Sequence, residues 1–380
     1  MEKYIQIAVD AYKGYASYLW HEITNPNWHN YFYWLIGVSA VFFIFEMAAP
    51  WRKDQPKFRQ DFFMDFFYMF FNFFIFSLVI YNAASDVVVN LFKDGLAAIG
   101  ITNLVALEVQ SWPVWAHLLF GFVVRDFVQW WGHRLLHASP WLWEFHKVHH
   151  SVQQMGFAAH LRYHWFENIF YRTIEYIPLA LIGIGLNDFF IIHIFTLAVG
   201  HYNHSNITVS GRTTGLVLGA FLGLAFGKAA LAWDWPQTLM LAGGLSVFFG
   251  FAVGKYMKVI FNSPEMHIWH HAHHLPEERQ TGINFGLTLG VWDYIFGTAY
   301  VPYAGRDIKL GFPGVEHHPK TFWGQLAYGF GLTKLEREHN ARGFVPDENP
   351  EDFTVYENKL VDNMEHGETN APNQKASVAQ

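Results

Sequence analysis

The chain contains no cysteine among its 380 residues. It therefore forms no disulfide bond, and a metal held by this chain must be bound through nitrogen or oxygen rather than thiolate sulfur. The sequence also contains no Walker loop, no dinucleotide-binding fingerprint and no haem motif of the His-Pro-Gly-Gly type. The chain thus carries no recognisable motif of its own for a nucleotide, a flavin, a nicotinamide or a b-type haem.

Charged side chains are also scarce, at 15% of the residues, whereas 52% are hydrophobic and 19% are aromatic. This composition is too apolar for an ordinary soluble protein of this length. We therefore expect an integral membrane protein. The formal net charge is -7, and we expect no nucleic-acid partner.

Two apolar stretches near the start of the chain predict membrane-spanning helices. Residues 31–49 and 62–81 each have about the 20 residues that a helix needs to cross a bilayer. The loop between them is basic, and the positive-inside rule places such a loop in the cytoplasm. Its basic residues are Arg52, Lys53, Lys57 and Arg59.

Later apolar stretches complete the predicted topology. Residues 114–131 predict a span that returns to the cytoplasmic side, whereas 174–200 are too few for two crossings and predict a hairpin that enters the membrane partway. Residues 216–226 and 238–253 predict a second apolar pair. The expected fold is therefore all-α, with about four transmembrane helices, partial hairpins and a cytosolic helical cap that carries the histidines.

Histidines are abundant, and 14 of the 22 fall in short clusters at helical spacing. Residues three or four apart share one face of a helix, so each cluster can present two or three nitrogens to one point. Imidazole suits iron, zinc, copper and nickel, and there is enough of it here for two metal ions. The clusters are His133 and His137; His146, His149 and His150; His160 and His164; His201 and His204; and His267, His270, His271, His273 and His274.

Together with their neighbours, these clusters form a series of motifs whose order and separations resemble the sterol desaturase and fatty acid hydroxylase superfamily over about residues 110–300. The motifs are Asp126-x6-His133-Arg134-x2-His137, Trp143-x2-His146-x2-His149-His150-Ser151, His201-x2-His204-Ser205-Asn206, Ser263-Pro264-x2-His267-x2-His270-His271, Asn284-Phe285-Gly286 and Trp292-Asp293-x2-Phe296-Gly297-Thr298. The resemblance implies a membrane-bound, di-iron, O2-dependent enzyme that hydroxylates or desaturates an unactivated C–H bond of a lipid. A sterol and a fatty acyl chain are both candidate substrates.

The resemblance also implies which histidines bind the two irons. It assigns this role to the histidines of the first, second and last motifs and, by the match to the intermediate histidines, to the His201 pair. The implied ligands are His133, His137, His146, His149, His150, His201, His204, His267, His270 and His271.

Four further residues have roles that the sequence leaves open between metal ligand and outer partner. His164-x2-Glu167 resembles a His-Pro-x-Glu element, although Trp165 replaces the proline. His274 continues the His267 stripe by one helical turn. Asp126 can accept the second N–H of a metal-bound ring, or form an ion pair with a neighbouring arginine.

Hydropathy, the resemblance and composition together divide the chain into three regions. Residues 1–110 predict an N-terminal membrane region, and 111–300 the catalytic domain, with an inserted hydrophobic hairpin at about 214–252. That hairpin lines the path of the lipid, forms a subunit contact, or only packs. Residues 301–380 predict a tail that is disordered at its end, because it becomes acidic and poor in apolar residues.

Several functional expectations follow. We expect a separate electron donor, either cytochrome b5-like or a ferredoxin, at a cytoplasmic catalytic face in a bacterial inner membrane or the endoplasmic reticulum. The alternatives are a metal transporter and a zinc hydrolase. Transporters usually place their ligands at the membrane midplane, and a zinc hydrolase of the His-Glu-x2-His type needs a glutamate that no cluster here has.

Overall fold

The protein is built from helices throughout the part of the chain that the structure describes. The computed structural model describes residues 2–26, 30–78, 82–100, 105–227 and 231–331, and in these ranges β-pairing is limited to two isolated bridges. The longer helices are α1 (Glu2–Thr24), α2 (Tyr31–Ala48), α3 (Phe62–Phe70), α4 (Asn82–Ala98), α5 (Val114–Ala138), α6 (Pro140–His150), α7 (Trp165–Leu181), α8 (Leu186–His204), α9 (Gly211–Ala225) and α10 (Trp235–Val247). The prediction of an all-α protein is confirmed for these residues.

Short helical segments complete the described chain. They include the π-helices η1 (Phe71–Ile75) and η6 (Phe248–Ala252) and the 3-10 helix η4 (Phe157–Leu161). The remaining short helices are α11 (Met257–Ile260), α12 (Pro264–His270), α13 (Val291–Ile295) and α14 (Phe322–Leu326), and the remaining 3-10 turns are η3 (Val109–Ser111), η7 (Gly254–Tyr256), η8 (Glu277–Arg279) and η9 (Val315–His317).

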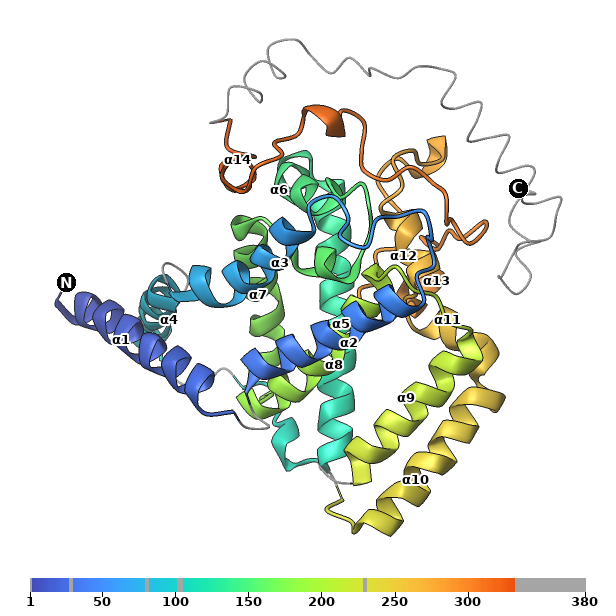
Figure 1. Ribbon diagram of the computed structural model, residues 1–380. Coiled ribbons are helices and arrows are strands. Elements are labelled where there is room, and N and C mark those ends of the chain that lie inside the picture. Colours follow the sequence, from blue (N-terminus) through green and yellow to red (C-terminus); the bar gives the residue numbers. More distant parts are fainter. Residues whose placement is uncertain (1, 27–29, 79–81, 101–104, 228–230, 332–380) are drawn as a thin grey trace.

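Helix α5 runs through the centre of the molecule, and its upper end in Figure 1 lies beside α6 and α12. It packs against α6, α7 and α8, while α8 also packs against α2 and α12. Helices α1 and α4 pair with each other at one side of the molecule, and α9 and α10 project from it as a separate arm (Figure 1). The histidine-bearing helices thus meet at one end of α5.

The predicted number of membrane-spanning helices is not confirmed. Among the described helices, α2 is long and apolar enough to cross a membrane by itself, as the sequence predicts. A second candidate is the segment from Trp235 to Ala252 taken together with Gly254–Ile260, which is bent by 66°. The apolar helix Phe62–Ile75 is shorter than a span, and α5 interrupts its apolar surface with Arg125.

The apolar stretch at residues 174–200 forms two helices joined by a turn, as predicted. Helix α7 ends at Leu181 and α8 begins at Leu186. Gly183 has a φ of +74°, a conformation that favours glycine, so it permits the sharp reversal between the two helices. This turn sends α8 back towards α6, and His204 therefore lies beside the other histidines.

The inserted segment forms a closely packed helical hairpin of α9 and α10. Glycines on one face of α9 recur at every fourth residue, and a Cβ atom at Gly215 would lie 2.2 Å from the carbonyl oxygen of Phe249. A Cβ at Gly219 would lie 2.2 Å from the carbonyl oxygen of Leu245. The missing side chains thus let the two backbones come into direct contact, as in small-residue helix pairs of membrane proteins.

The segments that flank the central region pack onto it. Ser39 of α2 lies within hydrogen-bonding distance of His201, and the Asn72 side-chain amide donates to the carbonyl oxygen of Leu161. At the other end of the chain, the Tyr68 hydroxyl donates to Gln325 near α14. The predicted disorder at the end of the tail falls within residues 332–380, which lie outside the described residues.

Candidate metal centre

Nine buried or half-buried histidines converge on two neighbouring points. They come from α5, α6, α8 and the end of α12, and within each group the candidate ligand atoms all lie within 4.8 Å of one another. The first group contains His133, His137, His146, His150 and His270. The second group contains His149, His204, His267 and His271.

The division between the groups follows the helical spacing. Histidines four residues apart stay together: His146 and His150 of α6 both face the first group, and the His267 and His271 pair of α12 faces the second. The third histidine of each motif, His149 or His270, turns to the other group, because it directly precedes a member of the pair and consecutive helical residues point about 100° apart. Helices α6 and α12 therefore each contribute to both groups.

The two groups are in direct contact. The ring centroids of His150 in the first group and His271 in the second are 4.3 Å apart, and the rings stack at 26°. His146 and His149 also connect the groups, with ring centroids 5.3 Å apart. The arrangement therefore resembles one site with two halves rather than two separate sites.

Distances between the nitrogens fit the binding of metal ions. Two ligand nitrogens bound at right angles, each roughly 2.1 Å from one metal, would be about 3.0 Å apart. His133 Nε2 and His146 Nε2 are 3.1 Å apart in the first group. In the second group His204 Nε2 lies 2.9 Å from His267 Nε2 and 3.3 Å from His149 Nε2.

Several of these rings have a buried nitrogen that finds no hydrogen-bond partner among the described residues. A buried polar atom without a partner is costly, and a metal ion would supply one. Three such atoms belong to the first group: Nε2 of His137, of His150 and of His270. Nδ1 of His149 and of His271 also has no partner, but it lies on the far side of rings whose Nε2 faces the second group, so it is not evidence for a metal.

Outer hydrogen bonds orient several of the rings. His133 Nδ1 donates to the Phe285 carbonyl oxygen at 2.7 Å, and His270 Nδ1 donates to the Ile283 carbonyl oxygen at 2.8 Å. Because Nδ1 then carries the proton, Nε2 is left with the lone pair that a metal needs. Main-chain carbonyls of the segment 283–285 thus set the tautomer of two histidines in the first group.

Glu167 acts in the same way on His146. Its Oε1 accepts a hydrogen bond from His146 Nδ1 at 2.8 Å, and the carboxyl group is fully buried at the start of α7. Burial raises the pKa of Glu167 well above its usual value. The sequence left this residue open between ligand and outer partner, and in the structure it contacts Nδ1 of His146, not the Nε2 that lies beside His133.

Burial also keeps the histidines neutral. The pKa of His149 and of His270 is well below the usual value, mainly because the imidazolium ion is costly to bury and secondly because neighbouring histidines would repel its charge. His146, His150, His267 and His271 show the same direction, again with burial as the largest cause. A neutral ring is the form that binds metal.

The motifs after the last histidine cluster support the ring of His133. The Asp293 carboxylate accepts hydrogen bonds from the backbone N–H groups of Phe285 and Gly286, each at 2.8 Å. It also accepts from Trp130 Nε1 at 3.0 Å, so it ties this turn to α5. Through Phe285, Asp293 therefore positions His133 without touching it.

Asp126 has a different role from the ring-orienting role considered above. It accepts hydrogen bonds from Trp292 Nε1 at 2.7 Å and from the Leu289 backbone N–H at 3.3 Å. These contacts fix the segment 289–292 against α5. The second nitrogen of His133, which Asp126 was a candidate to hold, is instead bonded to Phe285.

His201 lies outside both groups, in contrast to the ligand role that the resemblance implied. Its Nε2 is 3.0 Å from Ser39 Oγ, and its Nδ1 is 2.9 Å from Nδ1 of His160. His160 in turn lies beside His204, with ring centroids 5.1 Å apart. The sequence grouped His160 with His164, but in the structure its partner is His201 of α8. Spacing along the chain does not reveal that contact.

His164 and His274 also lie outside the two groups. His164 caps the start of α7: its Nδ1 accepts from the Phe166 backbone N–H at 3.1 Å, and its Nε2 donates to the Leu326 carbonyl oxygen at 2.9 Å. The helix α12 ends at His270, so the predicted stripe does not reach His274. His274 Nε2 instead lies 3.2 Å from His273 Nδ1.

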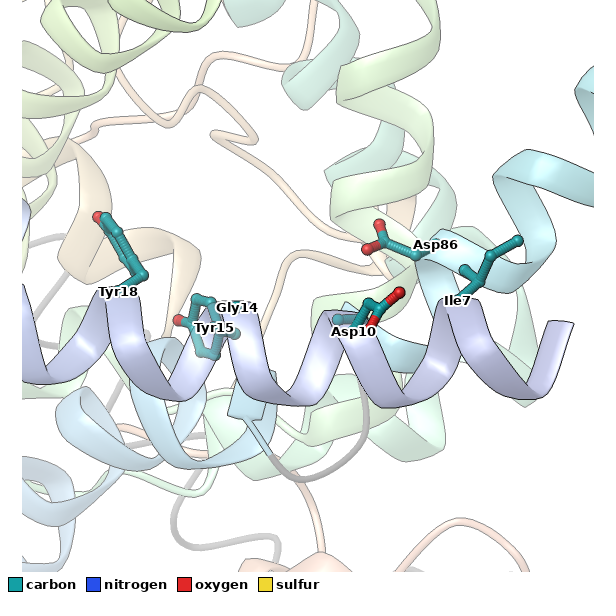
Figure 2. A pocket seen from close by; sticks show the side chains of 7 residues that line it. Ile7, Asp10, Gly14, Tyr15, Tyr18 and Asp86 are labelled. Carbon is teal, nitrogen blue, oxygen red and sulfur yellow. The ribbon is translucent and has the colours of Figure 1, made fainter. Parts of the chain in front are cut away.

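Two hollows occur on the surface away from the histidines. One, of about 260 Å³, lies between α2 and α3, and nearly all of its lining is apolar, with Ser39 as its hydroxyl-bearing residue. The other, of about 490 Å³, lies between α1 and α4 and is shown in Figure 2, where Asp10 and Asp86 line it from the two helices. No histidine lines either hollow.

Comparison with known proteins agrees with the geometry. Residues 118–298, which hold all nine grouped histidines, match the fatty acid hydroxylase family. The resemblance seen in the sequence motifs is thereby confirmed.

Three curated relatives of this chain have names that describe lipid-modifying enzymes. The chain is 27% identical to ornithine lipid hydroxylase OlsE of Rhizobium tropici over 221 residues, which are 58% of this chain and 52% of the relative. Over 48 residues, or 12% of the chain, it is 55% identical to methylsterol monooxygenase 2-2 and 52% identical to methylsterol monooxygenase 2-1 of Arabidopsis thaliana. The match spans about half the length of the first relative and 18% and 17% of the other two. No solved structure matches this chain.

Proposed function

We propose that this protein is an O2-dependent oxidoreductase that holds two iron ions and hydroxylates an unactivated C–H bond of a lipid, with desaturation as the related outcome. The observation that carries the proposal is the pair of adjoining, all-histidine groups of five and four rings. The match to the fatty acid hydroxylase family supports it.

The donor set favours two irons over other metals. All nine candidate ligands are imidazoles, which suit iron, and no thiolate is available to favour a softer ion. A structural zinc ion takes four ligands and a catalytic one usually three, whereas the first group here offers five. We propose His133, His137, His146, His150 and His270 as ligands of one iron and His149, His204, His267 and His271 as ligands of the other.

Each part of the protein has a defined task in this proposal. Bound iron would supply the activation of O2 that oxidation of an unactivated C–H bond requires. Glu167 and the carbonyl groups of Ile283 and Phe285 hold the rings in the tautomer that binds metal. Burial of the groups excludes water, which protects a reactive centre from side reactions.

The substrate, the membrane and the electron donor belong to the same proposal. A lipid substrate is supported by the names of the curated relatives, which are a lipid hydroxylase and two sterol monooxygenases. The apolar helix α2 and the exposed apolar side chains of the α9–α10 arm support membrane insertion. We further propose about four spans, a cytoplasmic catalytic face and a separate donor, either cytochrome b5-like or a ferredoxin.

Two other functions fit the site less well. A zinc hydrolase needs a free general base beside its metal, whereas Glu167, a carboxylate in contact with the first group, accepts a hydrogen bond from His146 Nδ1. A transporter must release its ion, whereas nine converging rings, three of them with the tautomer set by an outer hydrogen bond, favour permanent binding. Metal content distinguishes these functions from the proposed one.

The test is the metal content of the full-length protein purified in detergent, measured by mass spectrometry. We expect about two irons per chain, and about half of that in His270→Ala and in His149→Ala, which each remove a ligand from one group. His317→Ala is the matched control, because the His317 side chain is 64% exposed and lies outside both groups. Oxygen uptake with a reductant and a lipid extract then tests the reaction. Full iron retention in both variants, or a single zinc in the wild type, would contradict the proposal.

A further inference from the structure

A second buried polar cluster lies inside the helix bundle, apart from the grouped histidines. Arg125 of α5 donates to Glu175 of α7 at 3.1 Å and to Thr196 of α8 at 2.7 Å. Gln129, one turn further along α5, donates through its amide to the other oxygen of Glu175 at 2.7 Å. His193 Nδ1 lies 3.2 Å from the Arg125 guanidinium. The cluster thus joins α5, α7 and α8, and the charges of Arg125 and Glu175 are paired with each other.

Two polar atoms of this region remain without a partner among the described residues. One is Oε1 of Gln129, whose side chain is 93% buried, and the other is the hydroxyl of Tyr31. The Tyr31 ring lies against His193, with centroids 5.0 Å apart, so α2 brings this hydroxyl to the same cluster. A structural network of this kind normally satisfies all of its polar atoms. The two unpartnered atoms therefore point to a ligand.

The chemistry of the open atoms restricts that ligand. The positive charge of Arg125 is matched by Glu175, so Arg125 itself does not require an anionic ligand. Gln129 Oε1 can only accept a hydrogen bond, whereas the Tyr31 hydroxyl can donate one. A hydroxyl group satisfies both, because it donates one hydrogen bond and accepts others.

On each of three helices, a residue of the cluster is eight positions from a grouped histidine or from Glu167. Arg125 precedes His133 by eight residues on α5, and Thr196 precedes His204 by eight on α8. On α7, Glu175 follows Glu167, the partner of His146, by eight residues. Eight residues of helix correspond to a rise of about 12 Å.

Aromatic rings lie between the histidine groups and the Arg125 cluster. The Tyr163 ring stacks on His149 of the second group, with centroids 5.4 Å apart. Tyr171 lies 6.4 Å from Tyr163 and is midway along α7 between Glu167 and Glu175. These rings offer an apolar surface over the distance between the histidines and the polar cluster.

From these observations we propose that the Arg125 cluster binds the hydroxyl group of the lipid substrate. The Gln129 Oε1 atom accepts its hydrogen bond and the Tyr31 hydroxyl donates to it, while the apolar part of the lipid extends along Tyr171 and Tyr163. This inference rests on the proposed lipid oxidation and adds the substrate class: an amphiphile with a neutral hydroxyl about 12 Å from the oxidised carbon. Arg125 and Glu175 are positioning residues that hold Gln129 in place.

Equilibrium binding to the full-length protein in detergent, without reductant, tests this proposal. The probes are 1-hexadecanol and 1-methoxyhexadecane, because the methyl ether lacks the O–H that Gln129 would accept. We expect the wild type to prefer the alcohol roughly tenfold, as the loss of one buried hydrogen bond implies. Gln129→Leu should abolish the preference, and Tyr31→Phe should weaken alcohol binding.

Thermal unfolding and iron content, measured on the same samples, separate this binding from structural effects. A cluster that only joins helices would lower the unfolding temperature in Gln129→Leu without changing the ratio of alcohol to ether binding, and that result would overturn the proposal. An equal affinity of the wild type for both probes would do the same. Because binding is read without turnover, it stays measurable even if the protein proves to hold no iron, so failure of this inference and failure of the proposed function are distinguishable.

Discussion

At the scale of the residue, the most instructive contacts are those on the far side of the histidine rings. An imidazole binds metal through one nitrogen, and the partner of the other nitrogen decides which one that is. Here a carboxylate holds His146, whereas main-chain carbonyls hold His133 and His270. The carboxylate is the partner that a side-chain substitution can remove.

Replacing Glu167 with leucine should therefore weaken the first group selectively. Loss of the acceptor frees His146 to adopt the wrong tautomer, and we expect the metal affinity of that group to fall roughly 10–100-fold. Glu167→Gln is the matched control, because its amide oxygen still accepts from His146 Nδ1. Competition with a chelator measures both sites. Equal affinities in the leucine variant and the wild type would show that Glu167 does not orient the ring.

At this scale the sequence predicts which histidines group together, but not every contact that a histidine makes. The nine grouped histidines were all among the predicted ligands, because helical spacing and the family motifs both select them. His201 was predicted with them, yet it is bonded to Ser39 of α2, 162 residues away in the chain. No local pattern reveals a partner that distant.

At the scale of the element, the α9–α10 hairpin is a self-contained arm. Its stability depends on direct contact of two backbones at the glycines of α9. None of the grouped histidines lies on either helix. The arm should therefore be separable, in its stability, from metal binding.

A bulky residue on the glycine face of α9 tests this separation. A Cβ at Gly219 would overlap the backbone of α10, so Gly219→Val should force the helices apart and lower the thermal unfolding temperature by several degrees. Gly243→Ala on α10 is the control, since no atom lies within 4 Å of the position of its Cβ. We expect the iron content to be unchanged in both variants. Loss of iron in Gly219→Val alone would show that the arm supports the centre.

At the scale of the whole molecule, the centre collects many buried neutral histidines in one interior. The pKa values of the six on α6 and at the end of α12 are lowered by burial. Below about pH 6.5 the same residues take up protons in an unfolded chain. The folded metal-free protein then binds fewer protons than the unfolded chain, so acid favours unfolding.

We therefore expect the thermal unfolding temperature of the metal-free protein to fall as the pH is lowered from 7.5 through 6.5 to 5.5. The raised pKa values of Glu167 and Asp293 act in the opposite direction, because these carboxyls gain protons more readily in the folded state. Six histidines should outweigh these two groups. Bound metal should reduce the dependence by blocking protonation of the rings. A constant or rising unfolding temperature in the metal-free protein would contradict this account.

The sequence by itself determined the helical class, the histidine motifs and the family, because helical spacing and motif order are local properties of the chain. It also located α2 and the turn between α7 and α8 closely. Four membrane spans were expected, but hydropathy and helix length support one or two in the described chain. Buried polar residues such as Arg125 account for part of this difference, since an interior partner allows a charge where hydropathy alone does not.

Only the tertiary structure decided how the histidines divide. The His146 and His267 motifs could each present their histidines to one point, yet each is split between the two groups, because consecutive histidines on α6 and at the end of α12 face different groups. The fold likewise assigned His164 to a helix cap and Asp126 to the 289–292 segment. Spacing along a helix fixes which side chains share a face, but what that face meets depends on contacts between distant parts of the chain.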